Sequence, residues 1–79
     1  MKTVKPNEIY RHYKGNVYRV LHLAKHTETM EDMVIYTPAS GDGTEVWARP
    51  LSMWKEKVER DGKIYERFVY IEEEKGYDQ

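Results

Sequence analysis

Turn-forming residues recur along this chain at intervals typical of short strands, with a further break at residues 26–29. Gly15-Asn16, Pro38, Pro50 and Asp61-Gly62 fall between runs rich in Val, Ile and Tyr. Glycine beside asparagine or aspartate favours tight hairpin turns, and proline cannot donate a hydrogen bond to a strand ladder. The spacing of these turn residues predicts an all-β, or mainly β, fold of short antiparallel strands.

The segments between these turns predict five strands and one helical turn. The expected strands are residues 9–14, 17–25, 32–37, 45–49 and 64–71. Helical periodicity is confined to residues 51–60, where Ser52 could cap a short helix. This pattern favours a small SH3-like barrel of about five antiparallel strands with one short helical turn. An open antiparallel sheet covered by one short helix is the alternative.

The length of 79 residues fits one domain. We expect residues 1–8 to be a lead-in, residues 9–71 to form the single small β domain, and residues 72–79 to form an acidic flexible tail. Large rings must fill the interior, because the chain has seven Tyr, two Trp and one Phe.

The absence of cysteine excludes disulfides, thiolate zinc sites and cysteine nucleophiles. The N-terminal residues lack the apolar run of a signal peptide, and no segment approaches the ~20 apolar residues of a membrane span. We therefore expect a soluble, cytoplasmic protein with no membrane partner.

Charge is distributed unevenly along the sequence. Residues 1–26 carry six Lys and Arg against one acid, whereas residues 27–79 carry seven against thirteen acids. Such halves can give a basic face for an anionic partner. We favour the other interpretation, in which interleaved strands let the two halves pair with each other.

Several motifs along the chain occur together in one bacterial family. They are YRHYKG at residues 10–15, HTET at 26–29, WARP at 47–50, DGK at 61–63 and RF at 67–68. With these motifs the chain resembles the small domains of unknown function numbered sixteen fifty-three (DUF1653), from about Ile9 to Ile71. Trp54 stands where that family more often has Phe. The resemblance implies a small bacterial domain, stand-alone or fused, and brings no established activity, substrate or catalytic residue.

The histidine spacing argues against a metal site. His22 and His26 are four apart on an expected strand, and four residues of strand span ~13 Å, whereas zinc ligands lie ~2 Å from the ion. His26 with Glu28 and a third group from elsewhere stays open. We predict no metal and no cofactor.

The sequence also offers little support for a catalytic motif. Ser40 and Ser52 lack the context of a nucleophile elbow. Acids crowd residues 28–32, but an acid–base pair also needs a concave, water-poor pocket. We therefore name no catalytic residue and expect no enzyme. A small metal-dependent accessory or enzymatic domain is kept as an alternative, using His26, Glu28 and Arg49.

The first expected hairpin combines rings with cations. Strand alternation places His12 and Lys14 on one face with Tyr10, and Arg11 with Tyr13 on the other. Such a surface suits a peptide laid in an aromatic groove and, as a second candidate, single-stranded nucleic acid. The same tyrosines could instead build the core.

Trp47 and Arg49 share a face of their expected strand. We favour a core position for Trp47, with Arg49 pairing an acid such as Glu28; an exposed Trp47 beside the guanidinium is the alternative. The sequence thus predicts a non-catalytic binding module for a peptide or protein segment, either monomer or homodimer. The candidate ligand-binding residues are Tyr10, Arg11, His12, Tyr13, Lys14, Tyr18, His26, Glu28, Trp47 and Arg49.

Overall fold

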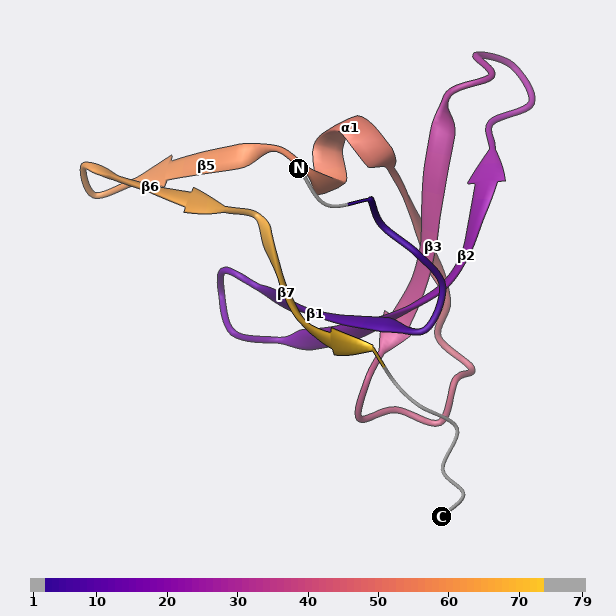
Figure 1. The fold of residues 1–79 in the computed structure, drawn as a ribbon, viewed down its shortest axis with the longest axis horizontal. Helices are drawn as coiled ribbons and strands as arrows, with labels where there is room; N and C mark the ends of the chain where they lie inside the picture. Colours follow the sequence, from indigo (N-terminus) through magenta and orange to yellow (C-terminus); the bar gives the residue numbers. More distant parts are fainter. Residues whose placement is uncertain (1–2, 74–79) are drawn as a thin grey trace.

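The computed structural model describes residues 3–73, which form one open antiparallel sheet, a separate hairpin and a helical turn (Figure 1). The helical turn α1 (Leu51–Trp54) precedes the hairpin. The sheet order is β4-β3-β2-β1-β7. The strands of this sheet are β1 (Glu8–His12), β2 (Val17–Lys25), β3 (Asp32–Pro38), β4 (Trp47–Pro50) and β7 (Phe68–Glu73), and the hairpin pairs β5 (Lys57–Arg60) with β6 (Lys63–Glu66).

The prediction of an all-β fold is confirmed, but no closed barrel is found within residues 3–73. Strands β4 and β7 are the two edges of the sheet and do not pair, so the SH3-like barrel is not confirmed. The expected strand at 64–71 is interrupted at Arg67, which separates β6 from β7. Because β6 then pairs with β5, the hairpin does not close the sheet, and the arrangement corresponds to the alternative open sheet.

Two of the predicted turns contain residues with positive φ, a backbone conformation that their sequences favour. Asp61 and Gly62 both have positive φ, 53° and 77°, as in the type I′ turns whose twist matches a two-stranded hairpin. Gly15 has φ 111°, a region that favours glycine. The loop at Gly15 is longer than the predicted two-residue turn, since β1 ends at His12 and β2 begins at Val17. The N–H of His12 donates a hydrogen bond to the carbonyl of Asn16 at 2.7 Å across this loop.

The short helix differs from the prediction in length and in its start. It spans four residues only, and Pro50 precedes it with no side-chain cap. The predicted cap by Ser52 is therefore wrong, because Ser52 lies inside the helix. Residues 3–73 contain no helix with the length and apolar character needed to cross a bilayer.

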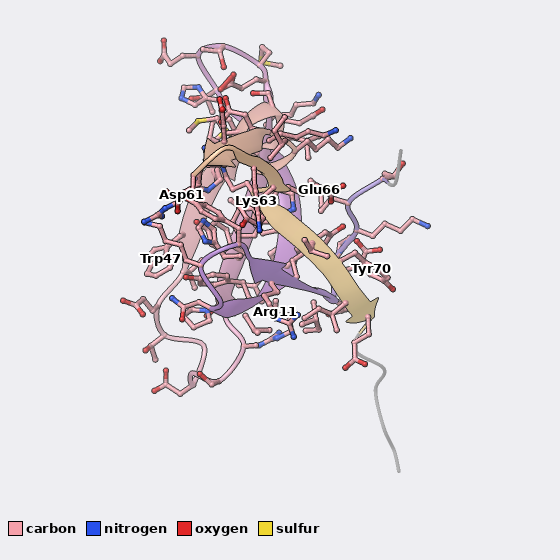
Figure 2. The ribbon with its side chains drawn as sticks, turned by 90° about the vertical axis from the view of Figure 1, so that its left-hand side faces the viewer. Arg11, Trp47, Asp61, Lys63, Glu66 and Tyr70 are labelled. Atoms are coloured by element: carbon pink, nitrogen blue, oxygen red, sulfur yellow. The ribbon has the colours of Figure 1, made fainter. Side chains whose placement is uncertain are left out.

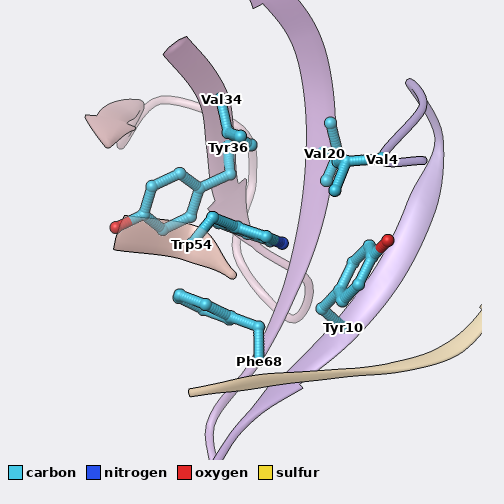
Figure 3. Packing of buried hydrophobic residues seen from close by; sticks show 7 residues of the cluster. All are labelled: Val4, Tyr10, Val20, Val34, Tyr36, Trp54 and Phe68. Carbon is cyan, nitrogen blue, oxygen red and sulfur yellow. The ribbon is translucent and has the colours of Figure 1, made fainter. Parts of the chain in front are cut away.

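The core lies between the sheet and α1 and is mostly aromatic (Figure 3). Trp54, 2% exposed, stacks on Phe68 with ring centroids 3.7 Å apart and meets Tyr10 and Tyr36 edge-on at 5.3 and 5.0 Å. The two edge-on contacts have a geometry that is favourable for ring pairs. The buried hydrophobic residues are Val4, Tyr10, Val20, Val34, Tyr36, Trp54 and Phe68.

A buried carboxylate closes one end of this core. Glu8 is 2% exposed and accepts hydrogen bonds from Lys5 N–H and from the Tyr10 hydroxyl, both at 2.9 Å. Burial, and then the bond to Glu8, raises the pKa of Tyr10 above its ordinary value of 10.0. Val4 and Glu8 of the expected lead-in thus pack against the domain. Residues 74–79 of the expected tail lie outside the described part of the chain.

Candidate functional site

An open cleft of about 670 Å³ lies where the starts of β2 and β4 flank the end of β3. Strand register brings its rings together, since Tyr36 pairs with Trp47 and Tyr18 pairs with Pro38 across adjacent strands. We call this site the aromatic cleft. It is lined by His12, Lys14, Asn16, Tyr18, Tyr36, Val46, Trp47, Ala48, Arg49 and Phe68.

Trp47 is the most exposed ring of the cleft, at 40%. Its centroid lies 5.7 Å from Tyr36 and 5.9 Å from Tyr18, so one side of the indole is packed and the rest reaches solvent. The expected core position of Trp47 is therefore wrong. The reason is the sheet edge: β4 has a neighbour, β3, on one side only. Phe68, 5% exposed, forms the floor.

Arg49 supplies a cation inside the ring cluster. Its Cζ lies 5.5 Å from the Phe68 centroid, within the range of a cation–π contact. Its Nε–H donates to the Tyr36 hydroxyl at 3.4 Å. The structure thus places Arg49 against rings and not against Glu28, the acid proposed from the sequence. The guanidinium can present its remaining donors to a ligand.

His12 lies at the other wall of the cleft. Its ring meets Phe68 edge-on at 5.0 Å, and its Nδ1 accepts the backbone N–H of Lys14 at 3.2 Å. Burial, and then the charges of Arg49, Arg67 and Lys14, lower the pKa of His12. The imidazole is therefore neutral near pH 7, with Nε2 carrying the proton because Nδ1 accepts a bond.

The cleft is positively charged. Arg49 and Lys14 line it, and no Asp or Glu does so among the described residues. The positive charges that depress the pKa of His12 are the same ones that an incoming anion would meet. The arrangement can therefore bind an anionic group beside an apolar or aromatic one.

Five of the predicted site residues line the cleft, and the others lie elsewhere. Tyr13 lies next to the cleft, with its ring 4.7 Å from that of His12. Tyr10 is in the core at 5% exposure. Arg11 is exposed on the other face of β1, where it pairs with Val17 and Val69. The residues that line the cleft are His12, Lys14, Tyr18, Trp47 and Arg49.

His26 and Glu28 lie in the turn between β2 and β3. This turn is at the far end of β2 from the β1–β2 turn (Figure 1), whereas the cleft is lined by residues near the start of β2. The length of β2 separates this turn from Tyr18 by ~26 Å. His26 Nδ1 accepts the N–H groups of Glu28 and Thr29 at 3.1 and 3.3 Å, which organises the turn. Within residues 3–73, no group of three or more His, Asp or Glu side chains is placed to hold a metal ion.

Sequence reasoning missed five residues of the cleft lining, which are Asn16, Tyr36, Val46, Ala48 and Phe68. Phe68 pairs with His12 across β1 and β7, two strands that are far apart in sequence. The alternation of β3 and β7 predicts which residues share a face, but only strand order reveals that these faces meet at one cleft.

Comparison with known proteins identifies the family. The family model described as protein of unknown function (DUF1653) matches residues 8–70. The chain belongs to this family. It is similar to the crystal structure of a DUF1653 protein from Bordetella bronchiseptica, at 36% identity over 95% of this chain and 96% of that one, with a TM-score of 0.75. No curated protein matches the chain. The resemblance inferred from the motifs is confirmed, and DUF1653 membership brings no assigned activity.

Proposed function

We propose that this DUF1653 chain is a non-catalytic binding module whose aromatic cleft takes an acidic segment of a partner protein. The observation that supports this most directly is a half-exposed Trp47 beside Arg49 and Lys14 in a cleft with no carboxylate among its described lining residues. Aromatic and arginine side chains dominate the binding energy of protein interfaces. A side chain with a ring or an aliphatic body would cover the indole, and a neighbouring carboxylate would meet the guanidinium.

Net charge favours a peptide over nucleic acid as the ligand. The protein has a formal charge of −1 and a pI near 6.3, whereas nucleic-acid-binding domains are typically strongly basic. Asp61 at the hairpin turn lies close to Lys14 and would repel a phosphate backbone that continued along this surface. A segment with a few carboxylates needs only the local positive charge of the cleft.

The composition of the cleft also supports a binding role over a catalytic one. Its lining holds one histidine and, within the described residues, no Ser, Thr, Asp or Glu. A serine or threonine nucleophile, or a pair of carboxylates, would need at least one of the four residue types that this described lining lacks. The charge-assisted and ring contacts of so small a surface suit an affinity in the micromolar range.

Titration of the ¹⁵N-labelled protein with a pool of acidic decapeptides, each with one central Tyr, Phe, Leu or Pro, tests the proposal. We expect the indole signal of Trp47 to shift, while that of Trp54, buried at 2% exposure, serves as an internal reference. Arg49→Gln and Trp47→Ala should each weaken binding at least about tenfold. Ile64→Ala is the matched control, because Ile64 is 70% exposed on the hairpin and outside the cleft lining.

Two results would contradict the proposal. One is the absence of any shift in the Trp47 indole signal when each acidic peptide pool is added at millimolar concentration. The other is equal binding of pools in which Gln replaces every Glu, because then charge would play no part. Tighter binding of ten-residue oligothymidylate with a steep loss at high salt would instead support the single-stranded nucleic-acid alternative.

A further inference from the structure

A second pair of rings lies beside the aromatic cleft and is not part of the core. Tyr13, in the β1–β2 turn, and Tyr65, on β6, have nearly parallel rings with centroids 6.2 Å apart and planes inclined by 21°. Tyr65 is 41% exposed. Lys14, Arg60 and Asp61 share a shallow depression of about 490 Å³ with these two rings. We call Tyr13 and Tyr65 the tyrosine pair.

The chain holds the tyrosine pair in place through hydrogen bonds at the bend between β6 and β7. Arg67 N–H donates to the Glu56 carbonyl at 3.0 Å, and Tyr13 N–H donates to the Arg67 carbonyl at 2.9 Å. Arg67 Nη2 also donates to Glu56 Oε1 at 2.9 Å. These bonds tie both ends of the hairpin to the β1–β2 turn. The pair is therefore formed before any ligand arrives, which lowers the entropy cost of binding.

The tyrosine pair and the aromatic cleft form one continuous surface. Lys14 borders both depressions, and the His12 ring contacts Phe68 on one side at 5.0 Å and Tyr13 on the other at 4.7 Å. Figure 2 shows Trp47 and the hairpin-tip residue Asp61 toward the same side of the molecule. Ring contacts of 4.7–6.2 Å lead from Trp47 to Tyr65 through Tyr18, Phe68, His12 and Tyr13. Because an extended chain advances ~3.3 Å per residue, this path corresponds to at most about eight residues.

We infer that the tyrosine pair is a second subsite for the same ligand, and that the partner is an extended acidic segment with two ring-bearing residues, aromatic or proline. This inference rests on the proposed function. One ring of the segment packs on Trp47 and the other packs on Tyr13 and Tyr65, as rings do on exposed tyrosines in peptide-recognition grooves. The carboxylates between them face Lys14, and Asp61 disfavours an acid at the outer end of the segment.

Two kinds of acidic decapeptide of equal charge test this inference, with the Trp47 and Tyr65 signals of the labelled protein as readouts. One kind carries a single Tyr, and the other carries two Tyr separated by three, five or seven residues. We expect at least one two-ring peptide to bind about tenfold or more tighter, because the second contact becomes intramolecular. Tyr65→Ala should remove this gain and leave single-ring affinity unchanged. Tyr65→Thr, which keeps a strand-forming residue, repeats the test if the alanine variant unfolds.

The outcomes separate the inference from the function on which it rests. Equal binding of one-ring and two-ring peptides, or a gain that survives in both Tyr65 variants, would overturn the second subsite and leave the cleft intact. A Trp47 signal unmoved by every peptide would overturn both proposals. Displacement of bound peptide by oligothymidylate at lower concentration than by two-ring peptide would also overturn the inference, because the partner would then be nucleic acid.

Discussion

Replacing Tyr10 by Phe removes a buried hydrogen bond and also removes a phenol whose pKa is raised in the folded protein. The loss of the hydrogen bond and the loss of the titrating group change stability differently with pH. The Tyr10 hydroxyl donates to Glu8 Oε1 at 2.9 Å, and Tyr10 is 5% exposed. Deleting a hydrogen bond to a charged, buried acceptor costs about 2 kcal/mol. At pH 8 we therefore expect Tyr10→Phe to lower the free energy of unfolding by about 2 kcal/mol.

Alkaline pH should shrink this difference. The folded protein raises the pKa of Tyr10 above the 10.0 of an exposed phenol, so the fold favours the neutral form. This contribution is complete below the unfolded pKa and is lost as pH rises toward the folded one. At pH 11 the wild type loses about 1.4 kcal/mol as the unfolded phenol ionises, whereas the Phe variant loses nothing at this position. The gap should fall from about 2 to roughly 0.6 kcal/mol.

Urea unfolding followed by far-ultraviolet circular dichroism at pH 8 and pH 11 measures both gaps. Tyr65→Phe is the matched control, because Tyr65 is 41% exposed; at pH 8 it should change stability by less than about 0.5 kcal/mol. A gap between wild type and Tyr10→Phe that stays constant or widens from pH 8 to pH 11 would refute the reasoning. It would mean that the Tyr10 hydroxyl is not held in a buried bond to Glu8.

Three further predictions follow from the site and its support. In urea unfolding, Trp54→Ala should lower the free energy of unfolding by about 3–5 kcal/mol, because its ring is buried against Phe68. Trp47→Ala should lower it by less than about 1 kcal/mol. Equal losses in the two variants would contradict the assigned burial. The lowered pKa of His12 means that the fold favours neutral imidazole, so stability holds above the unfolded value of 6.5 and falls as pH drops below it. His12→Asn should flatten this acid limb between pH 7 and pH 5, and an unchanged slope would argue against the cationic surroundings. Arg67→Ala should increase amide hydrogen exchange throughout the β5–β6 hairpin by removing the bond to Glu56, with Arg60→Ala as the control; unchanged exchange would show that the backbone bonds suffice.

The local part of the fold could be predicted from the sequence, because turns are local. Asp61-Gly62 and Gly15 require positive φ, and residues with that preference are recognisable without a structure. The limits of β2 were predicted as observed, at Val17 and Lys25. The bend at Arg67 was not predicted, because nothing in the residues 64–71 breaks a strand. It depends on bonds to Glu56 and Tyr13, which come from distant parts of the chain.

The candidate site was only partly predictable for the same reason. Period-two alternation placed His12 and Lys14 together on one face. Both line the cleft, but Lys14 lies in the β1–β2 turn because β1 ends at His12 and not at the predicted residue 14. The exposure of Trp47 depends on β4 being an edge strand, which sequence alternation does not specify. His12 and His26 were both predicted to bind a ligand, but His26 follows the end of β2 and so lies at the other end of the sheet.

The bend at Arg67 makes the β5–β6 arm a separable part of the molecule. Among the described strands, β5 and β6 pair with each other, and the arm meets the rest of the molecule through a few bonds at its base and the Tyr13–Tyr65 contact. Exchanging residues 58–65 for another hairpin of equal length would therefore alter one contact region while the ring-filled interior keeps its packing. A scaffold of this kind permits changes of ligand preference by grafting, without redesign of the sheet.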